Sequence, residues 1–199
     1  HWEGKSMRRI LNADDQSDDR FGYSCYALVF PVSGEIQEET DPIERASGST
    51  RAKIPAHVTV KGTFCGIESL SDLRRLVRFI TGNTRRFHIS FEGAESVWRS
   101  AGGGLRVPAR SEMQALHDAL VAGIVPISTS AYIDDPYWPH MTYVQEVSVA
   151  ALEQALQLVA HADFGDGFWA DSIDLMGRVG KAHGGRWELI EQFPLAGTD

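Results

Sequence analysis

The order of local patterns repeats along this chain, and the repeat constrains the fold more than any other feature. Each half has a proline shortly before a strand-like His-x-Thr sequence, at residues 57–59 in the first half and 140–142 in the second. A serine-capped amphipathic pattern follows in each half, and then a segment that begins with phenylalanine. The two histidines are 83 residues apart (140 − 57). This order predicts a diverged duplication that folds into two pseudo-symmetric lobes.

Hydrophobic periodicity and capping residues predict the individual elements. Helices are expected over 69–81, over 111–124 and after Ser148, and strands over 23–32, 57–64, 87–98, 105–109, 140–147, 168–179 and 186–195. The glycines at 102–104 are interpreted as a turn, because they lack the Lys-Ser/Thr ending of a phosphate-binding loop. The acidic segment 34–50 is expected to be a loop, which could act as a lid, or to hold a short helix from Asp41. The predicted fold is α+β and bilobal, with two antiparallel sheets lining a central cleft and helices outside.

Composition narrows the protein class. The chain has 199 residues, 43% hydrophobic and 23% charged, which is ordinary for a globular protein. No apolar run approaches the roughly 20 residues that a membrane helix needs, so no membrane partner is expected. Residues 1–20 are interpreted as a disordered N-terminal segment or a cloning remnant, and 21–199 as a single bilobal domain. We expect a monomer.

Charge and cysteine content bear on partners and compartment. The net charge is −8, whereas proteins that grip long nucleic acids usually present a basic surface. The expected partner is therefore a small nucleotide-type phosphodiester. Cys25 and Cys65 lie in apolar, strand-like segments and are predicted to be buried thiols in a reducing, cytoplasmic compartment.

The two His-x-Thr strands carry the candidate chemistry. Alternate residues of a strand share a face, so His57 and Thr59 point one way, and His140 and Thr142 do the same in the second half. One neutral imidazole can take a proton from water or a ribose hydroxyl, and the other, protonated, can give one to the departing oxygen. The threonine hydroxyls can donate hydrogen bonds to the phosphate oxygens. This set predicts phosphodiester cleavage without a metal or other cofactor.

The other histidines fit different roles. The third match, His88-Ile89-Ser90, lacks a preceding proline and an equivalent in the second half. His117 is expected in the core or on a helix surface, His161 near a helix C-terminus, and His183 in a turn. The sequence has no His-Glu-x-x-His and no Cys-x-x-Cys, so no metal site is predicted.

The paired motifs resemble those of the 2H phosphoesterase superfamily, which includes bacterial 2′-5′ RNA ligase-like proteins and plant and yeast cyclic phosphodiesterases. Tyr-Ser-Cys-Tyr-Ala-Leu at 23–28 is similar to the first strand of the cyclic phosphodiesterases, and Pro-Tyr-Trp-Pro-His-Met-Thr at 136–142 to their second motif. The resemblance implies that His57 and His140 are the acid–base pair and that Thr59 and Thr142 hold the phosphate. It also implies that Tyr26 lines the site against a base or ribose.

The resemblance further implies a 2′,3′-cyclic nucleotide or ADP-ribose 1″,2″-cyclic phosphate as substrate, opened to a phosphomonoester. Two positions depart from it. Gln145 stands where the relatives tend to have an aromatic residue or an arginine, and Lys61 where the RNA ligase-like proteins often carry arginine. Lys61, on the same predicted face as His57, either contacts phosphate or points to solvent. Tyr137 and Trp138 either stack on a base or pack the loop.

Two other functions stay open from the sequence. One is a 2′-5′ oligonucleotide phosphodiesterase or RNA end-processing enzyme, which would need a basic rim for its longer substrate. The other is a nucleotide- or RNA-binding module without turnover, although a binder has no need of two imidazoles on facing strands.

Overall fold

A computed structural model describes residues 19–48, 54–97, 102–133, 136–145, 147–180 and 185–197 of the chain. Residues 1–18 of the predicted N-terminal segment 1–20, and the turn with His183, lie outside the described residues. The helices are α1 (Gly34–Ser47), α2 (Leu70–Gly82), α3 (Ser111–Ile124) and α4 (Val149–Val159), with short 3₁₀ turns at Asp19–Phe21 and Val125–Ile127. The strands are β1 (Cys25–Pro31), β2 (His57–Cys65), β3 (Phe87–Ile89), β4 (Ala94–Val97), β5 (Gly102–Arg106), β6 (Ser130–Ala131), β7 (His140–Gln145), β8 (Phe168–Ala170), β9 (Ser172–Val179) and β10 (Arg186–Pro194).

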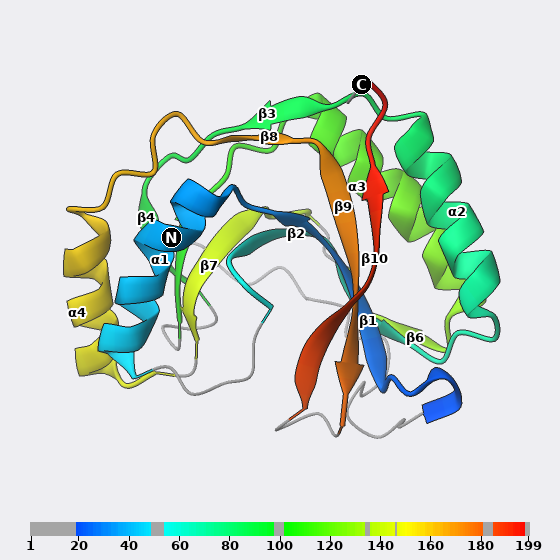
Figure 1. Cartoon of the computed structure of the whole chain (residues 1–199), viewed down its shortest axis with the longest axis horizontal. Coiled ribbons are helices and arrows are strands. Elements are labelled where there is room, and N and C mark those ends of the chain that lie inside the picture. Colours follow the sequence, from blue (N-terminus) through cyan, green and yellow to red (C-terminus); the bar gives the residue numbers. More distant parts are fainter. Residues whose placement is uncertain are drawn as a thin grey trace.

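The strands form antiparallel sheets, and the helices lie outside them, which confirms the predicted α+β class. The larger sheet has the order β10-β9-β1-β2-β7-β5-β4, with β6 also paired to β2, and β3 and β8 form a separate pair. Helices α2 and α3 lie together beside one half of the large sheet, and α1 and α4 beside the other half (Figure 1). The two His-x-Thr strands, β2 and β7, are neighbours at the junction of these halves.

The predicted helix starts are confirmed at two serines. Ser69 Oγ accepts a hydrogen bond from the Asp72 backbone N–H at 3.2 Å, and Ser148 Oγ accepts one from Ala151 at 3.2 Å. Each serine thus satisfies an N–H group that has no partner within the first helical turn. Helix α3 spans the predicted residues, 111–124.

Of the two alternatives for the acidic segment, the loop was wrong and the short helix from Asp41 was too short, because α1 is a helix of 14 residues that begins well before Asp41. Ser33 caps it, and its buried residues Ile36, Thr40, Ile43 and Ser47 recur at helical spacing. The acidic residues lie mainly on its more exposed faces, and Pro42 lies inside it. Helix α1 packs against α4 and β7, so these 14 residues belong to the helical layer of the fold.

The glycine run was also misinterpreted, since Gly102, Gly103 and Gly104 are buried residues of β5 rather than a turn. A Cβ atom on Gly103 would lie 2.6 Å from Cε2 of the Tyr143 ring. The strand therefore needs glycine where the tyrosine of the neighbouring strand packs over it. Gly93, at φ 124°, separates β3 from β4, which the sequence analysis had joined. Asp171 is the single residue between β8 and β9, which the sequence analysis had also joined.

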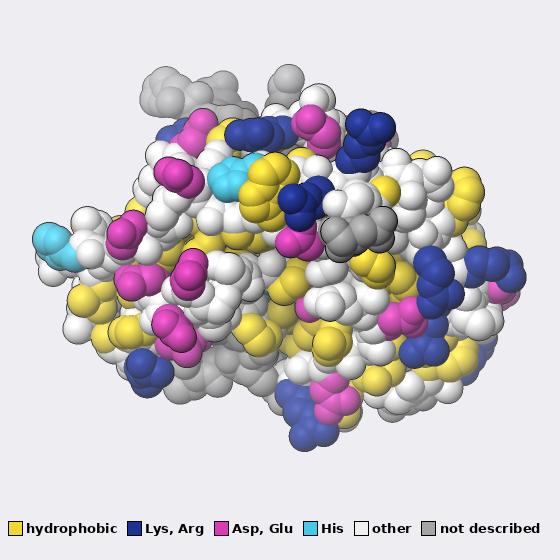
Figure 2. Space-filling model, turned by 45° about the horizontal axis from the view of Figure 1, so that its top comes forward, with side chains coloured by type: hydrophobic (Ala, Val, Ile, Leu, Met, Phe, Trp, Pro, Cys, Tyr) yellow, Lys and Arg dark blue, Asp and Glu magenta, His cyan; other side chains and the backbone are white. Residues whose placement is uncertain are grey.

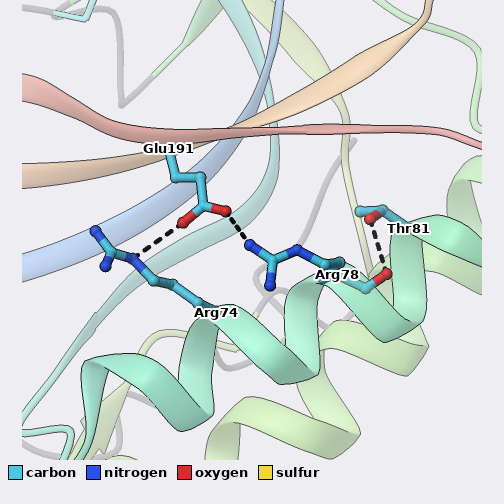
Figure 3. A network of polar contacts seen from close by, with 4 residues as sticks. All are labelled: Arg74, Arg78, Thr81 and Glu191. Carbon is cyan, nitrogen blue, oxygen red and sulfur yellow. Dashed lines mark hydrogen bonds and ion pairs between the residues drawn. The ribbon is translucent and has the colours of Figure 1, made fainter.

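An ionic network fixes α2 against the edge of the large sheet (Figure 3). The Glu191 carboxylate of β10 pairs with Arg74 Nε at 3.0 Å and with the Arg78 guanidinium, and Thr81 Oγ1 donates to the Arg78 carbonyl at 3.3 Å. Glu191 therefore faces the helices. Because strand residues alternate in direction, its neighbour Gln192 faces away from them.

All four helices pack on one face of the large sheet. Their buried side chains join one apolar cluster with strand residues that include Leu28, Phe30, Val58 and Met141. Cys25 and Cys65 are buried thiols, as predicted. None of the helices in the described part of the chain is long and apolar enough to cross a membrane.

Candidate active site

The two His-x-Thr strands pair directly with each other, and Val58 lies opposite Met141. Both of these side chains are fully buried on the helix side. Continuing the antiparallel register by one residue places His57 across from Thr142 and Thr59 across from His140, with Cβ atoms about 5 Å apart. These four residues are half-buried, and they share the opposite face, here named the histidine face.

Each motif histidine makes the same backbone hydrogen bond. His57 Nδ1 lies 2.7 Å from the Pro55 carbonyl oxygen, and His140 Nδ1 lies 3.0 Å from that of Trp138. In both motifs the acceptor is two residues before the histidine. A carbonyl can only accept, so Nδ1 carries the hydrogen in each ring. Nε2 is therefore the ring nitrogen that is left to bind or release a second proton.

The structure does not support the predicted role of Tyr26. Its side chain is 2% exposed, lies on the helix side with Leu28 and Phe30, and stacks on Phe64 with ring centroids 5.6 Å apart. A ring at this depth presents no surface to a ligand.

Lys61 is likewise not on the histidine face. It is 0% exposed, and its Nζ donates to the carbonyls of Tyr132 at 2.7 Å and Gly62 at 3.0 Å. The reason is a bulge in β2: Val29 pairs with Thr59 but Leu28 pairs with Lys61, so the register shifts by one residue. Such a shift moves the side chains that follow to the other face.

The two aromatic residues before the second motif have different environments. Tyr137 is 8% exposed, and its hydroxyl donates to the Thr59 carbonyl at 2.8 Å, so it packs the loop. Trp138 is 42% exposed, and its ring centroid is 4.5 Å from that of His140. Of this pair, Trp138 is therefore the one placed to stack on a ligand beside a motif histidine.

Arg106 is a site residue that the sequence analysis missed. It lies directly opposite His140 in the pairing of β5 with β7, so it belongs to the histidine face. Its side chain is 54% exposed, with Nε 3.5 Å from Glu92 Oε2. No local motif marks this arginine, because only the strand order brings β5 beside β7.

A second small apolar cluster lies on the histidine face of β1 and β9. It contains Ala27, Val29 and Met176, with Ile54 and Trp187 packed against it. Asp174 continues this face, since it pairs with Val29, which itself pairs with Thr59. Gln192 Nε2 donates to Asp174 Oδ1 at 2.9 Å. Burial raises the pKa of the Asp174 carboxyl, and the hydrogen bond from Gln192 opposes this shift.

The other described histidines, His88, His117 and His161, do not lie on either motif strand. His88 pairs with Trp169 across the β3–β8 ribbon, with ring centroids 5.5 Å apart. His117 is buried in α3, and His161 is exposed after the end of α4. The side chain of Gln145 lies outside the described residues. Within the described ranges, no three His, Cys, Asp or Glu side chains gather so that they could hold a metal ion.

The fold and the paired histidine strands define a 2H phosphoesterase. A family model described as the 2′-5′ RNA ligase superfamily matches residues 32–182, which is more than half of the chain. The chain therefore belongs to the 2′-5′ RNA ligase superfamily. No curated protein is similar enough in sequence to count as a match.

Several solved structures have the same fold over most of their length. The protein TT0787 of Thermus thermophilus is 16% identical with a TM-score of 0.62, over 87% of this chain and 98% of that one. E. coli LigT complexed with 3′-AMP is 14% identical with a TM-score of 0.61, over 85% and 97%. A structure described as a phosphoesterase is 15% identical with a TM-score of 0.59, over 86% and 98%. At these identities the likeness shows the fold alone.

Proposed function

We propose that the protein is a metal-independent phosphodiesterase that hydrolyses a small cyclic phosphodiester on ribose by two-histidine acid–base catalysis. The observation that carries the proposal is the matched pair of imidazoles on β2 and β7, each held through Nδ1 by the carbonyl two residues before it. Such a bond selects one tautomer and orients the ring, and it assigns proton transfer to Nε2 in both motifs. Two rings prepared in the same way on adjacent strands suit a reaction that needs a base and an acid together.

In the proposed reaction, the neutral histidine takes a proton from water at Nε2 while the water oxygen attacks phosphorus. The bond from phosphorus to one ribose oxygen breaks, and the protonated histidine gives its Nε2 proton to that oxygen. The product is a phosphomonoester with one freed hydroxyl, and the two histidines have exchanged protonation states. Because an unperturbed histidine has a pKa near 6.5, both states are accessible at neutral pH.

Three further side chains on the histidine face serve the phosphate in this proposal. Thr59 and Thr142 lie across from the two histidines and can donate hydroxyl hydrogen bonds to the non-bridging oxygens. Arg106, beside His140, supplies a positive charge and can make a bidentate contact. Lys61, buried and bonded to carbonyls, takes no part.

A nucleoside-type substrate suits the apolar surface beside the histidines. The exposed Trp138 ring lies next to His140, and the partly exposed Trp187 packs against the small apolar cluster on the other side, past Thr59. Aromatic side chains stack on bases without requiring a particular sequence. LigT has been solved with 3′-AMP and with ATP, which supports a nucleotide for this chain also.

Membership in the 2′-5′ RNA ligase superfamily favours one second candidate, cleavage of a 2′-5′ oligonucleotide or processing of an RNA end. A longer substrate gains affinity from a continuous basic surface. On the face shown in Figure 2, basic side chains gather over α2 and acidic ones over α1 and α4. That face is not the histidine face, so the comparison rests on the net charge of −8, which favours the smaller substrate.

The test is hydrolysis of the four 2′,3′-cyclic nucleotides and ADP-ribose 1″,2″-cyclic phosphate in excess EDTA. Wild type is compared with His57→Ala, His140→Ala and the matched control His88→Ala, which removes the histidine of the single His-x-Ser match. We expect turnover in wild type and His88→Ala, and a loss of about 10²- to 10⁴-fold in each motif variant.

Absence of turnover by folded wild type on all five substrates would reject the cyclic phosphodiesterase. Cleavage of a 2′-5′ dinucleotide in the same assay would then establish the second candidate. Nucleotide binding without any cleavage would instead indicate a binding module. Activity that EDTA abolishes and Mg²⁺ or Mn²⁺ restores would contradict the metal-independent mechanism.

A further inference from the structure

Two buried rings stack on each other behind the first motif strand. They are His117 of α3 and Tyr137 of the loop before β7, with ring centroids 4.0 Å apart and planes at 9°. His117 is 3% exposed and Tyr137 8%. Both are therefore fixed by packing on the helix side, away from any substrate on the histidine face.

Each ring holds one of two consecutive carbonyls of β2. The Tyr137 hydroxyl donates to Thr59 O at 2.8 Å, and His117 Nδ1 donates to Val60 O at 2.7 Å. These carbonyls lie at the bulge of β2, where the register with β1 shifts between Thr59 and Lys61. A bulge disrupts the ladder locally, and buried carbonyls need a donor from elsewhere. The two side chains supply it.

The loop that contains Tyr137 also orients the imidazole of the second motif histidine, His140. Trp138 follows Tyr137 directly, and its carbonyl accepts the hydrogen bond from His140 Nδ1 at 3.0 Å. Where that carbonyl lies depends on where Tyr137 is anchored. A continuous path of contacts thus runs from β2 through Tyr137 and Trp138 to the His140 imidazole.

We propose that Tyr137 and His117 are positioning residues, which set the orientation and tautomer of His140 relative to the first motif. Neither touches the reacting atoms. The consequence for turnover rests on the proposed function, but the consequence for the His140 ring does not. Anchoring the loop to the strand that carries His57 and Thr59 makes the geometry of the two motifs interdependent.

The experiment compares Tyr137→Phe with Tyr143→Phe. Both remove one buried phenolic hydroxyl, but that of Tyr143 has no hydrogen-bond partner among the described residues. The first readout is ¹⁵N NMR of labelled histidines, which reports the Nδ1–H tautomer of each ring without any substrate. The second is kcat and KM on the best cyclic nucleotide, measured across pH.

In Tyr137→Phe we expect His140 to lose its single Nδ1–H tautomer while His57 keeps it. We expect kcat to fall about three- to tenfold with little change in KM, as for the loss of one hydrogen bond, and the pH–rate limb that His140 governs to move. Tyr143→Phe should match wild type in all of these measurements.

His117→Phe retains a stacking ring and removes only the bond to Val60 O. If His117 and Tyr137 act as a unit, the double variant His117→Phe/Tyr137→Phe should lower kcat by less than the product of the two single-variant factors. An unchanged His140 tautomer in Tyr137→Phe would overturn the proposal even if wild type is active. A changed tautomer in a protein without turnover would leave it standing and reject only the proposed function.

Discussion

Val58 lies opposite Met141, and this buried pair sets the register between the two motif strands. Met141→Ala removes a side chain that is 0% exposed, so we expect a loss of about 2–5 kcal/mol in the free energy of unfolding. For a chain of this size, each kcal/mol corresponds to a melting temperature lower by about 2–4 °C. Denaturant titration and calorimetry measure both quantities.

Met141→Leu conserves volume and should cost less than about 1.5 kcal/mol. Val149→Ala, at a position 67% exposed on α4, is a control that should change stability little. If Met141→Ala were as stable as this control, the pair would not join the two halves of the sheet.

Arg106→Gln tests the cation beside His140. A hydrogen bond from a charged group contributes about 1.5–3 kcal/mol, so we expect kcat/KM on cyclic nucleotides to fall roughly 10- to 100-fold. Arg106→Lys should restore part of the loss, because it keeps the charge but not the planar fork. Arg75→Gln, which removes an arginine 80% exposed on α2, is the matched control. Equal activity of Arg106→Gln and this control would remove Arg106 from the site.

The parts of the fold that depend on local sequence could be predicted, and the parts that depend on strand pairing could not. Ser69, Ser148 and the bounds of α3 follow from capping and periodicity, which act within one helix. Helix α1 was not predicted over its full length, although its buried residues follow helical spacing, because the segment contains five acidic residues and Pro42. The strand at Gly103 could not be recognised from local sequence. Glycine is needed there because the ring of Tyr143, on another strand, packs over it.

The same distinction applies to the site. Strict alternation places His57 and Thr59 correctly on one face, but the bulge after Thr59 takes Lys61 to the other. Alternation cannot reveal a bulge, since the extra residue is defined only against the partner strand. Arg106 was missed for the related reason that its place beside His140 comes from pairing between β5 and β7.

Asp174 should make stability depend on pH in a specific direction. Burial raises the pKa of its carboxyl above the unfolded value, so its contribution to stability is fully present below the unfolded pKa and is lost as pH rises through the folded pKa. Asp174→Asn should therefore melt at a higher temperature than wild type at pH 7, by no more than about 2–4 °C. The difference should shrink as the pH falls toward 3.5, because the fraction of protonated wild-type carboxyl rises.

Melting curves between pH 3.5 and 8 measure this dependence. Gln192→Ala removes the hydrogen bond that opposes the shift and should move the melting temperature at pH 7 in the opposite direction. A pH-independent difference between Asp174→Asn and wild type would contradict the assignment.

Tyr143 carries a buried hydroxyl whose removal should not destabilise the protein. The side chain is 0% exposed, and the hydroxyl has no hydrogen-bond partner among the described residues. Burial, with a smaller effect of the Glu95 charge, raises the pKa of Tyr143 to about 12. An unsatisfied buried hydroxyl costs about 1–3 kcal/mol, so Tyr143→Phe should be as stable as wild type or more stable by up to about 1 kcal/mol. Tyr137→Phe, which loses a formed bond to Thr59 O, should instead lose about 1 kcal/mol. Urea unfolding of the two variants separates these expectations, and a loss in Tyr143→Phe as large as that in Tyr137→Phe would show that the Tyr143 hydroxyl has a partner after all.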